Sequence, residues 1–460
     1  MSLKPLKLFF SGIGGSGMSA LACFLTDKGH RVVGSDRAFD QNNSHPLRDM
    51  LLSKGIAIVP QDGSGLDSSF DLAVFSTAVE QDRPEVIKAK KVGVPAKTRP
   101  EYLAEIVCEF KTFAVAGTSG KSTTSGMLAF MMKRLGLEPN YIGGGRVKQF
   151  HDTANPGNSI TGDSDYLVIE ACESDGSIVN YKPLHTVILN LDLDHHPVEA
   201  TASMFRRLVE NTAGVIVLNA DDDNLNRLDV GDALTFSVTS HSDFRADDIV
   251  YHPFRTEFSV HGVRFALSLP GKHNLFNALS CIAVLARIGI PLKDIASVLH
   301  EFIGIERRFD IIMNDSKHLV IDDYAHNPHK IAALMETVRA IKDGVCYIFQ
   351  PHGFGPTRMM QREYIDTFTE YLRPSDHLVL LPIYYAGGTA AKDISSLDLA
   401  EGIKAAGKSV EVVERREDVF AQAGKWNTLV IFGARDETLS EFATHLAVLL
   451  QAKTANSNCS

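Results

Sequence analysis

Short runs of aliphatic and β-branched residues alternate along the chain with longer stretches in which apolar positions recur at helical spacing. This alternation is typical of α/β domains with mainly parallel sheets. It predicts strands over residues 6–10, 31–34, 71–76, 112–116, 166–170, 186–190 and 215–218. Helices are expected over 16–28, over 100–110 and from Lys121 onward.

The pattern changes in the middle of the chain. Residues 246–269 alternate as an inserted antiparallel hairpin would, and a helix is expected over 274–288. The strand–helix alternation restarts beyond residue 306, with strands predicted at 318–321, 345–349, 377–381 and 429–432. Because 460 residues suffice for about three domains, we predict α/β domains at 1–107, 108–306 and 307–460.

Composition narrows the class of protein. With 44% hydrophobic and 22% charged residues, the chain has enough apolar material for several cores. Its formal net charge of −10 disfavours nucleic acid as a partner, although a local basic pocket for a phosphorylated small molecule is compatible with it. The 6 cysteines form no C-x-x-C pair, which favours reduced thiols in a cytoplasmic protein. No apolar run approaches a membrane span, so no membrane partner is expected.

A glycine-rich turn, Gly12–Gly17, follows the first predicted strand and opens the first predicted helix. Glycines let the backbone approach a diphosphate, and the helix N-terminus offers free N–H donors. Asp36 ends the next strand, where such folds place a carboxylate on a ribose hydroxyl. The context favours a nucleotide site without identifying the nucleotide, and a plain strand–helix turn is the alternative.

A second glycine motif, Gly117-Thr118-Ser119-Gly120-Lys121-Ser122-Thr123, joins an apolar strand to a helix. Consecutive backbone N–H groups can wrap a phosphate there, Lys121 can neutralise the β- and γ-phosphates, and Ser122 can ligate Mg²⁺. Val115 stands where the full Walker pattern has a glycine, so the motif is a shortened form of it. We interpret it as an ATP site and expect an exposed Lys121 that contributes little to stability.

Acidic and histidine residues follow two of the predicted strands. Glu173 lies in the segment EACESD, and His195 lies in NLDLDHH. The carboxyl ends of parallel strands face the same crevice as a P-loop, so both side chains are candidates for a metal near the phosphates. Taken separately, each could be a solvated surface residue.

Nine segments occur in an order that resembles the Mur ligase family of peptidoglycan synthesis. They are SGIGGSGMSALA, STAV, AGTSGKSTT, EACESDGS, NLDLDHH, LPGKHNLFNAL, IERRFD, IDDYAHNPH and FQPH. The resemblance covers nearly the whole chain and implies an α/β fold of three domains. These are a Rossmann-like N-terminal domain, a central P-loop ATPase domain and a C-terminal Rossmann-like domain. It also implies an ATP- and Mg²⁺-dependent ligase with small-molecule substrates.

The resemblance implies a role for each matching position. A UDP-sugar would contact Gly12, Gly14, Gly15, Ser16, Gly17, Asp36, Ser76 and Thr77. ATP would contact Gly117, Thr118, Ser119, Gly120, Lys121, Ser122, Thr123, Asn274, Asn277 and Asp323. Metal would be held by Ser122, Glu173 and His195, and Arg308 would complete the catalytic set with Lys121, Glu173 and His195. The amino acid would lie near Tyr324, His326, His352 and Arg358.

The implied reaction joins the lactoyl carboxylate of UDP-N-acetylmuramate to an amino acid through an acyl phosphate. L-alanine is the favoured amine, although Gly353 and Pro356 stand where relatives that use it typically carry arginines. We therefore expect Arg358 to take over their role. Other departures are Ser119 for His or Asn, Asn327 for a second His, and Arg435 for a glycine.

Three alternatives remain open at this point. A related recycling ligase would join a murein tripeptide to the same sugar nucleotide, but it typically carries an R-S-N-T-M run that is absent here. A nicotinamide-dependent oxidoreductase would account for Gly12–Gly17 and Asp36 but leaves Lys121, Glu173 and His195 unexplained. The third is a nucleotide-binding protein that has lost its amine site. A monomer or a homodimer is expected.

Overall fold

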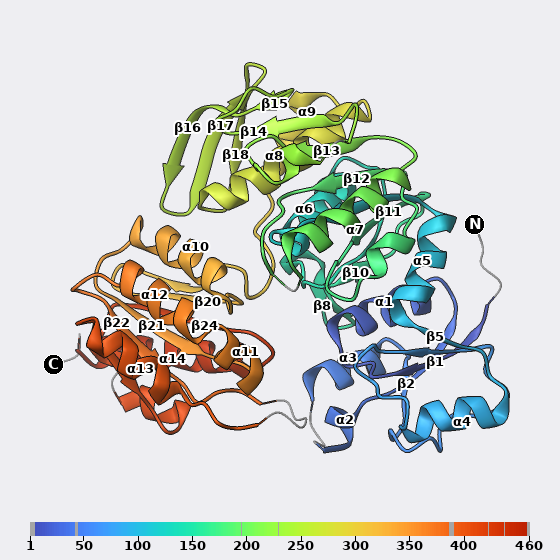
Figure 1. Ribbon diagram of the computed structural model, residues 1–460, viewed down its shortest axis with the longest axis horizontal. Helices are drawn as coiled ribbons and strands as arrows, with labels where there is room; N and C mark the ends of the chain where they lie inside the picture. The colour runs from blue at the N-terminus through green and yellow to red at the C-terminus, as the bar shows by residue number, and fades with distance from the viewer. Residues whose placement is uncertain are drawn as a thin grey trace. The chain divides into compact units, whose positions relative to one another are not determined.

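The computed structural model describes residues 5–41, 45–194, 196–228, 230–385, 391–421, 423–436 and 438–457. The chain forms two compact units, Met1–Ile305 and Glu306–Ser460. Each unit is built around parallel sheets covered by helices, which is the expected α/β architecture (Figure 1). No helix in the described ranges is both long and apolar enough to span a bilayer.

The first sheet is wholly parallel, with strand order β3-β2-β1-β4-β5. Its strands are β1 (Lys7–Ser11), β2 (Arg31–Ser35), β3 (Ala57–Ile58), β4 (Leu72–Phe75) and β5 (Ala96–Thr98). The helices around it are α1 (Ser16–Asp27), α2 (Arg37–Gln41), α3 (Pro46–Ser53), α4 (Pro84–Val92) and α5 (Arg99–Glu109). The strand order reverses direction between β1 and β4, which is the point at which open α/β sheets bind ligands.

The second sheet has the order β10-β7-β11-β6-β12-β13-β14-β15 and is parallel except where β10 meets β7. Its strands are β6 (Lys111–Ala116), β7 (Asn140–Ile142), β10 (Ser159–Ile160), β11 (Tyr166–Glu170), β12 (His185–Ile188), β13 (Ile216–Asn219), β14 (Leu234–Ser237) and β15 (Phe244–Arg245). The helices are α6 (Lys121–Arg134), α7 (Val198–Glu210), α8 (Lys272–Arg287) and α9 (Leu292–Leu299), and β8 (His151–Asp152) pairs with β9 (Asn155–Pro156). The strand β6, which leads into the second glycine motif, lies between β11 and β12.

The expected hairpin over 246–269 is instead a three-stranded antiparallel sheet. Its strands are β16 (Asp247–His252), β17 (Arg255–Val260) and β18 (Val263–Leu267). Phe258 and Phe265 of β17 and β18 are buried and stack at 5.4 Å, so one face of this sheet joins the core that also contains α6 and α8. Along β18 the buried Phe265 and Leu267 alternate with the more exposed Arg264 and Ala266, which is the alternation visible in the sequence.

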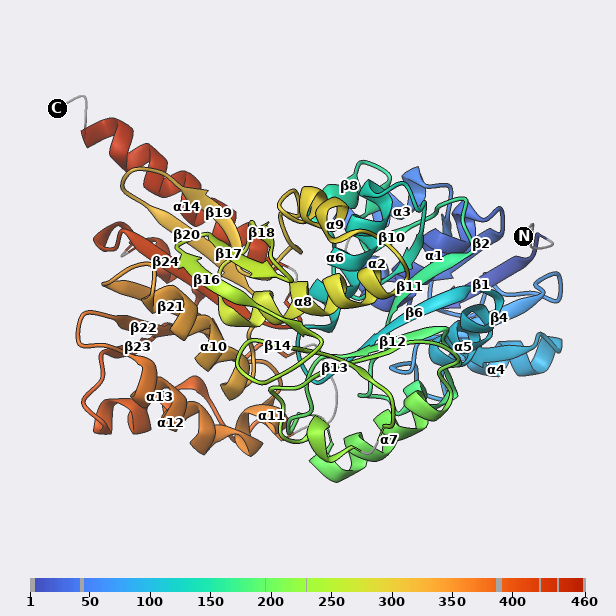
Figure 2. The same ribbon diagram turned by 90° about the horizontal axis from the view of Figure 1, so that it is seen from above.

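The second unit contains a sheet of order β19-β20-β24-β21-β22-β23 (Figure 2). Its strands are β19 (Asp310–Asn314), β20 (Leu319–Asp323), β21 (Val345–Gln350), β22 (His377–Leu380), β23 (Val410–Val412) and β24 (Thr428–Gly433). Its helices are α10 (Pro328–Arg339), α11 (Phe354–Met359), α12 (Gln361–Tyr371), α13 (Ser396–Ala405) and α14 (Thr438–Ser457). The antiparallel edge strand β19 was not predicted from the sequence.

The two sheets of the first unit are joined through α1. The Asn158 side-chain amide, which is buried, donates to the Ser16 carbonyl at 2.8 Å and to the Ser19 hydroxyl at 3.1 Å. Lys28 donates to the Gly162 carbonyl at 3.1 Å, and α1 lies beside β10 (Figure 1) and also contacts β7. Because these contacts flank α1 at both ends, the helix is fixed with respect to both sheets.

Candidate functional site

The second glycine motif is a turn between β6 and α6 whose backbone requires glycine at two positions. Gly117 has φ +138° and Gly120 has φ +86°, a region that residues with a side chain rarely adopt. A Cβ on Gly120 would lie 2.5 Å from the Asn277 side-chain oxygen, so α8 backs this turn closely. The first-turn N–H groups of α6 have no intrahelical acceptor, which leaves them available to an anion.

Asn190, which follows β12, holds the turn in shape. Its side-chain oxygen accepts from the Ser119 backbone N–H at 2.7 Å and from the Thr118 hydroxyl at 2.8 Å. Its amide nitrogen donates back to the Ser119 carbonyl at 3.0 Å. Asn190 was not predicted from the sequence, although its place at the carboxyl end of a strand beside β6 is the signal that could have indicated it.

Lys121 is not exposed, which corrects the expectation from the sequence. Its side chain is 10% exposed, and its ammonium lies 2.9 Å from the carboxylate of Glu173, which is 1% exposed. The ammonium also donates to the Gly117 carbonyl at 2.6 Å. Burial alone would lower the pKa of Lys121, but the neighbouring Cys172 and Glu173 side chains raise it above its usual value. Lys121 therefore carries its positive charge at neutral pH.

The residues around Ser122 suit a hard divalent cation. The Ser122 hydroxyl donates to Glu170 at 3.1 Å, and the other Glu170 oxygen accepts from the Gly144 N–H at 2.9 Å. The buried Glu173 Oε2 has the Lys121 ammonium beside it but no hydrogen bond. Hydroxyl and carboxylate oxygens are the ligands that Mg²⁺ prefers, so this set fits Mg²⁺. Within the described ranges no group of three or more His, Cys, Asp or Glu side chains forms a metal cluster. His195, predicted as a ligand, lies outside those ranges.

The helix α8 places both predicted asparagines behind the P-loop. Asn274 and Asn277 are each 5% exposed, and the Asn277 amide donates to the Asn274 side-chain oxygen at 3.3 Å. Asn274 in turn donates to the Pro270 carbonyl at 2.8 Å. Because Asn277 reaches Gly120, the structure brings this pair to the turn, while the contact to ATP stays a prediction.

The first glycine turn connects β1 to α1, at the place where the strand order of the first sheet reverses. The Gly12 and Ile13 N–H groups donate to the Ser35 carbonyl at 2.8 and 3.0 Å. The Asp36 carboxylate accepts from the Gly14 N–H at 2.8 Å and would collide with a Cβ at Gly14. A Cβ at Gly12 would lie 2.9 Å from the Ser76 Cβ, so the Ser76–Thr77 loop packs against the turn. Gly15 precedes α1 and Ser16 begins it.

A cation beside this turn was missed by the sequence analysis. The Arg99 guanidinium packs against Gly17, whose added Cβ would lie 3.3 Å from Arg99 Cδ. Arg99 also pairs with Asp175 at 3.3 Å. It follows β5 directly, so its position at the carboxyl end of a parallel strand is the signal that could have indicated it.

In the second unit, Arg307 and Arg308 lie in the short segment that precedes β19. Arg307 adopts φ +57° and is buried, and its guanidinium donates to the Gly433 and Asp436 carbonyls at 2.7 and 2.9 Å. Arg308, the predicted catalytic cation, lies over the Tyr324 ring at 5.0 Å. Arg307 is thus a structural residue, which the sequence could not distinguish from its neighbour.

Asp323 is the last residue of β20, and Tyr324 follows it directly. Asp323 accepts from the Phe309 N–H at 2.6 Å and from the Ala325 N–H at 2.7 Å. Burial raises the pKa of Asp323, with the positive Arg308 acting in the opposite direction. The Tyr324 hydroxyl accepts from the Arg435 N–H at 3.2 Å. Arg435 adopts φ +71°, which explains why a glycine is usual at that position.

The predicted amino-acid residues form two groups. His326 stacks edge-to-face with Tyr324 at 5.6 Å and with His352 at 5.2 Å. Burial lowers the pKa of His326 to about 3 and that of His352 to about 4, so both rings are neutral at pH 7. Arg358 on α11 instead pairs with Asp393 and donates to the Ala391 carbonyl at 3.1 Å.

Gly353 and Asn327, which differ from the residues that the family usually carries there, both have structural roles. Gly353 caps α11 with φ +69° and ψ 127°, and its added Cβ would lie 3.2 Å from Pro356 Cδ. An arginine at position 353 would therefore be strained in this backbone. Asn327 caps α10, and its side-chain oxygen accepts from the Lys330 N–H at 2.9 Å.

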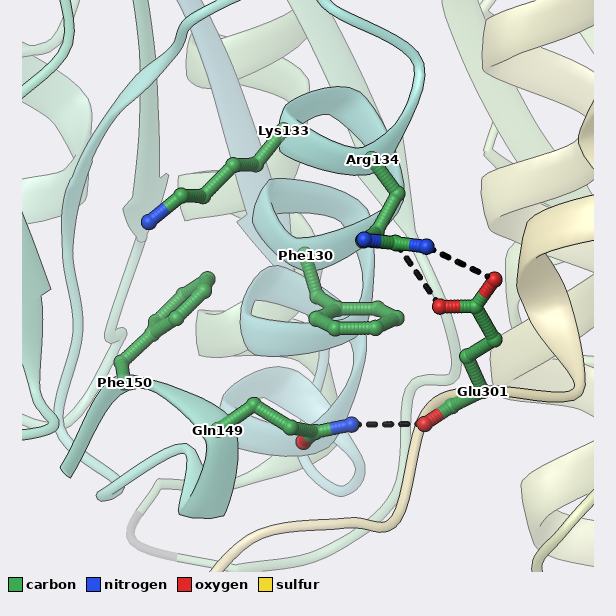
Figure 3. A pocket seen from close by; sticks show the side chains of 6 residues that line it. All are labelled: Phe130, Lys133, Arg134, Gln149, Phe150 and Glu301. Carbon is green, nitrogen blue, oxygen red and sulfur yellow. Dashed lines mark hydrogen bonds and ion pairs between the residues drawn. The ribbon is translucent and has the colours of Figure 1, made fainter.

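A pocket of about 310 Å³ lies at the other end of α6 (Figure 3). Arg134 pairs with Glu301 there, and the Gln149 amide donates to the Glu301 carbonyl at 2.7 Å. About thirteen residues of helix, or roughly 20 Å, separate Arg134 from Lys121. The pocket is thus distant from the P-loop and carries none of the predicted site residues.

Family models match three successive stretches of the chain. The Mur ligase family, catalytic domain, matches residues 7–111, the Mur ligase middle domain matches 115–285, and the Mur ligase, glutamate ligase domain, matches 307–435. A curated relative, the UDP-N-acetylmuramate–L-alanine ligase of Caldicellulosiruptor saccharolyticus, is 33% identical over 451 residues, which cover 94% of this chain and 96% of the relative. The enzyme of that name from Carboxydothermus hydrogenoformans is 34% identical, covering 91% and 90%.

Solved structures agree with these sequence matches. The UDP-N-acetylmuramate–alanine ligase of Thermotoga maritima superposes with a TM-score of 0.80 at 27% identity, covering 97% of this chain and 100% of that chain. A murein peptide ligase from Psychrobacter arcticus shares the fold, with a TM-score of 0.69 at 23% identity and coverage of 97% and 98%. On the sequence matches and the P-loop geometry together, the chain belongs to the Mur ligase family.

Proposed function

We propose that this ligase joins an amino acid, most favourably L-alanine, to the lactoyl carboxylate of UDP-N-acetylmuramate at the expense of ATP. The observation that carries the proposal is the P-loop in which Lys121 lies 2.9 Å from Glu173, in the same compact unit as the Gly12–Gly17 turn. The curated relatives named as UDP-N-acetylmuramate–L-alanine ligases, alike over nine-tenths or more of this chain, support the choice of substrates.

The reaction begins with activation of the carboxylate, because a carboxylate is a poor electrophile. The γ-phosphoryl group of ATP moves to the lactoyl carboxylate, and Lys121 offsets the charge that spreads over its oxygens. The turn from Gly117 to Gly120 and the first turn of α6 hold the phosphates through backbone N–H groups. We assign Arg308 the role of a second positive side chain beside the transferred phosphoryl group.

The second step forms the amide. The amine of the amino acid attacks the acyl carbon, a tetrahedral intermediate collapses, and inorganic phosphate leaves. Because their pKa values are lowered by burial, His326 and His352 can face the amine as neutral rings that hydrogen-bond without charge repulsion. We assign 1–107 to the sugar nucleotide, 108–306 to ATP and 307–460 to the amino acid.

Mg²⁺ would be held by Ser122 and Glu173, with Glu170 beside them and His195 as a further ligand. When bound, the metal neutralises phosphate charge and orients the γ-phosphoryl group. Glu170 also fixes the Ser122 hydroxyl through its 3.1 Å hydrogen bond, so it orients a ligand even where it is not one itself.

The experiment is phosphate release by the purified protein with ATP, Mg²⁺, UDP-N-acetylmuramate and a panel of amines, with product masses recorded. L-alanine should give both phosphate and a product heavier by one alanyl residue. Coupling of a tripeptide alone would favour the recycling ligase, and phosphate release without any ligated product would favour a protein that has lost its amine site. If the protein binds NADH and forms no amide, the ligase proposal fails.

A further inference from the structure

Arg99 contacts both the end of the first glycine turn, at Gly17, and the loop after β11 that carries Glu173. It is the first residue of α5, and the start of that helix is fixed by a capping box in which Thr98 and Glu101 bond reciprocally. Since β5 is parallel to β4 and β4 to β1, Arg99 lies at the edge of the sheet that carries the Gly12–Gly17 turn. The missing side chain at Gly17 makes room for its guanidinium at the first turn of α1.

The other contact of Arg99 is with the loop that follows β11. Its Nη2 lies 3.3 Å from Asp175 Oδ2, and the two side chains are 22% and 19% exposed. Asp175 is itself held, because its Oδ1 accepts from the Ser177 N–H at 3.0 Å and from the Ser177 hydroxyl at 2.5 Å. The same loop is closed by the Gly176 N–H, which donates to the Glu173 carbonyl at 2.9 Å.

These contacts form a continuous path between the two nucleotide sites. It runs from Gly17 through Arg99 and Asp175 to Glu173, whose carboxylate pairs with Lys121. Beside this path, Asn158 binds the first turn of α1 to the segment that leads into β10 of the second sheet. Arg99 thus contacts the first turn of α1 on one side and the loop that carries Glu173 on the other.

We propose that Arg99 is a positioning residue that holds the Glu173 loop through Asp175 while it donates to the diphosphate of the sugar nucleotide at the α1 N-terminus. This rests on the proposed function, because it takes the Gly12–Gly17 turn as the diphosphate site. A guanidinium has five N–H donors in a planar fork, and the hydrogen bond to Asp175 uses one of them. Bound diphosphate fixes Arg99, and Arg99 then fixes the loop that carries Glu173 beside the P-loop.

The consequence is a coupling between the two substrates. Sugar-nucleotide binding pre-orders the ATP site, and by thermodynamic reciprocity ATP binding favours the sugar nucleotide. The coupling limits wasteful ATP hydrolysis when the acceptor carboxylate is absent, because the ATP site is then less well ordered.

The test compares Arg99→Gln, Arg99→Lys, Asp175→Asn and the double variant Arg99→Gln/Asp175→Asn in the full-length chain. Arg31→Gln is the matched control, because Arg31 is an exposed arginine at the amino end of β2, on the opposite edge of the same sheet. Calorimetry measures UDP-N-acetylmuramate binding without ATP, and steady-state kinetics give the KM for ATP. Thermal unfolding confirms that each variant is folded.

We expect Arg99→Gln to weaken sugar-nucleotide binding at least about tenfold, as loss of a charge-assisted hydrogen bond implies, and to raise the KM for ATP. Asp175→Asn should raise the KM for ATP by a similar factor while sugar-nucleotide binding stays within about twofold. The KM for ATP of the double variant should be no higher than that of the poorer single variant. Arg99→Lys should recover part of the sugar-nucleotide affinity.

Two results would overturn the inference. One is sugar-nucleotide binding by Arg99→Gln that equals the wild type, and the other is additive effects of the two single substitutions on the KM for ATP. Failure of the proposed function itself looks different, because the wild-type protein would then give no heat with UDP-N-acetylmuramate at all.

Discussion

The Lys121 ammonium and the Glu173 carboxylate lie 2.9 Å apart in a site where neither side chain is more than 10% exposed. Each charge of such a buried pair offsets the free energy of removing the other from water, so loss of either partner leaves an unpaired buried charge. The Lys121 ammonium and a metal held by Glu173 would therefore compete for the same carboxylate oxygens. Several consequences can be measured.

Lys121→Ala should abolish product formation and also destabilise the fold. The unfolding free energy should fall by roughly 3 kcal/mol, because the substitution leaves the Glu173 carboxylate buried and unpaired. Urea denaturation and phosphate release measure the two effects. Adding Glu173→Gln should recover part of the stability but none of the activity. Near-normal ligation by Lys121→Ala would contradict the assignment of this turn to ATP.

Glu173→Ala, Glu170→Gln and His195→Ala should each raise the Mg²⁺ concentration needed for half-maximal activity. Loss of one ligand, or of the group that orients Ser122, weakens metal affinity several-fold without removing the chemistry. Mg²⁺ titrations of the ligation rate measure the effect, and Glu210→Gln, a surface pair with Arg207, is the control. Variants whose activity falls but whose Mg²⁺ requirement is unchanged would show that these residues do not act through metal.

Arg358→Ala tests the amino-acid end of the reaction. We expect the KM for L-alanine to rise at least about tenfold, because a guanidinium grips a carboxylate through paired charge-assisted hydrogen bonds. The KM values for ATP and the sugar nucleotide should change little. Asp393→Asn is the informative companion, since it removes the partner that Arg358 holds in the structure. Unchanged KM values for all three substrates would exclude Arg358 from amino-acid binding.

Gly353→Arg should not improve the use of L-alanine. The backbone at φ +69° and ψ 127° accommodates glycine, and a larger residue there should lower the unfolding free energy by roughly 1–3 kcal/mol. Gly353→Ala separates the backbone effect from the charge and should cost a similar amount. A gain in alanine affinity with unchanged stability would show that the loop adapts readily and that our reason for the departure is incorrect.

The neutral His326 and His352 rings predict a particular pH dependence. Their pKa values in the folded state, about 3 and about 4, lie below the value of an unfolded histidine. Below about pH 6.5 the unfolded chain binds protons that the folded chain does not, so stability falls as the pH is lowered towards 4. His326→Gln should flatten this fall in urea titrations between pH 7 and pH 4. If wild type and variant lose stability in parallel, His326 is not the group responsible.

The sequence by itself determined the class of fold and the identity of the loops that carry chemistry. The β1, β6, β11 and β24 strands lie within a residue or two of their predicted positions, because buried parallel strands are continuous apolar runs bounded by glycines and polar residues. The edge strand β19 escaped prediction because its apolar run, Ile311–Met313, is only three residues long and is bounded by Asp310 and Asn314. The sequence likewise indicated the backbone of the phosphate-binding turn, because Gly117 and Gly120 stand where that turn requires positive φ.

Only the tertiary structure decided which polar residues meet. Lys121 looked exposed because its loop is polar, but the loop after β11 brings Glu173 against it, and the end of β11 brings Glu170 against Ser122. The roles of Asn190, Arg99 and Arg307 could not be read from the sequence, although Asn190 and Arg307 lie in the segments NLDLDHH and IERRFD, because those roles depend on partners 71, 76 and 126 residues away in the chain. Periodicity reports which residues are buried, whereas the pairing of buried charges is set by how strands and helices from distant parts of the chain are brought together.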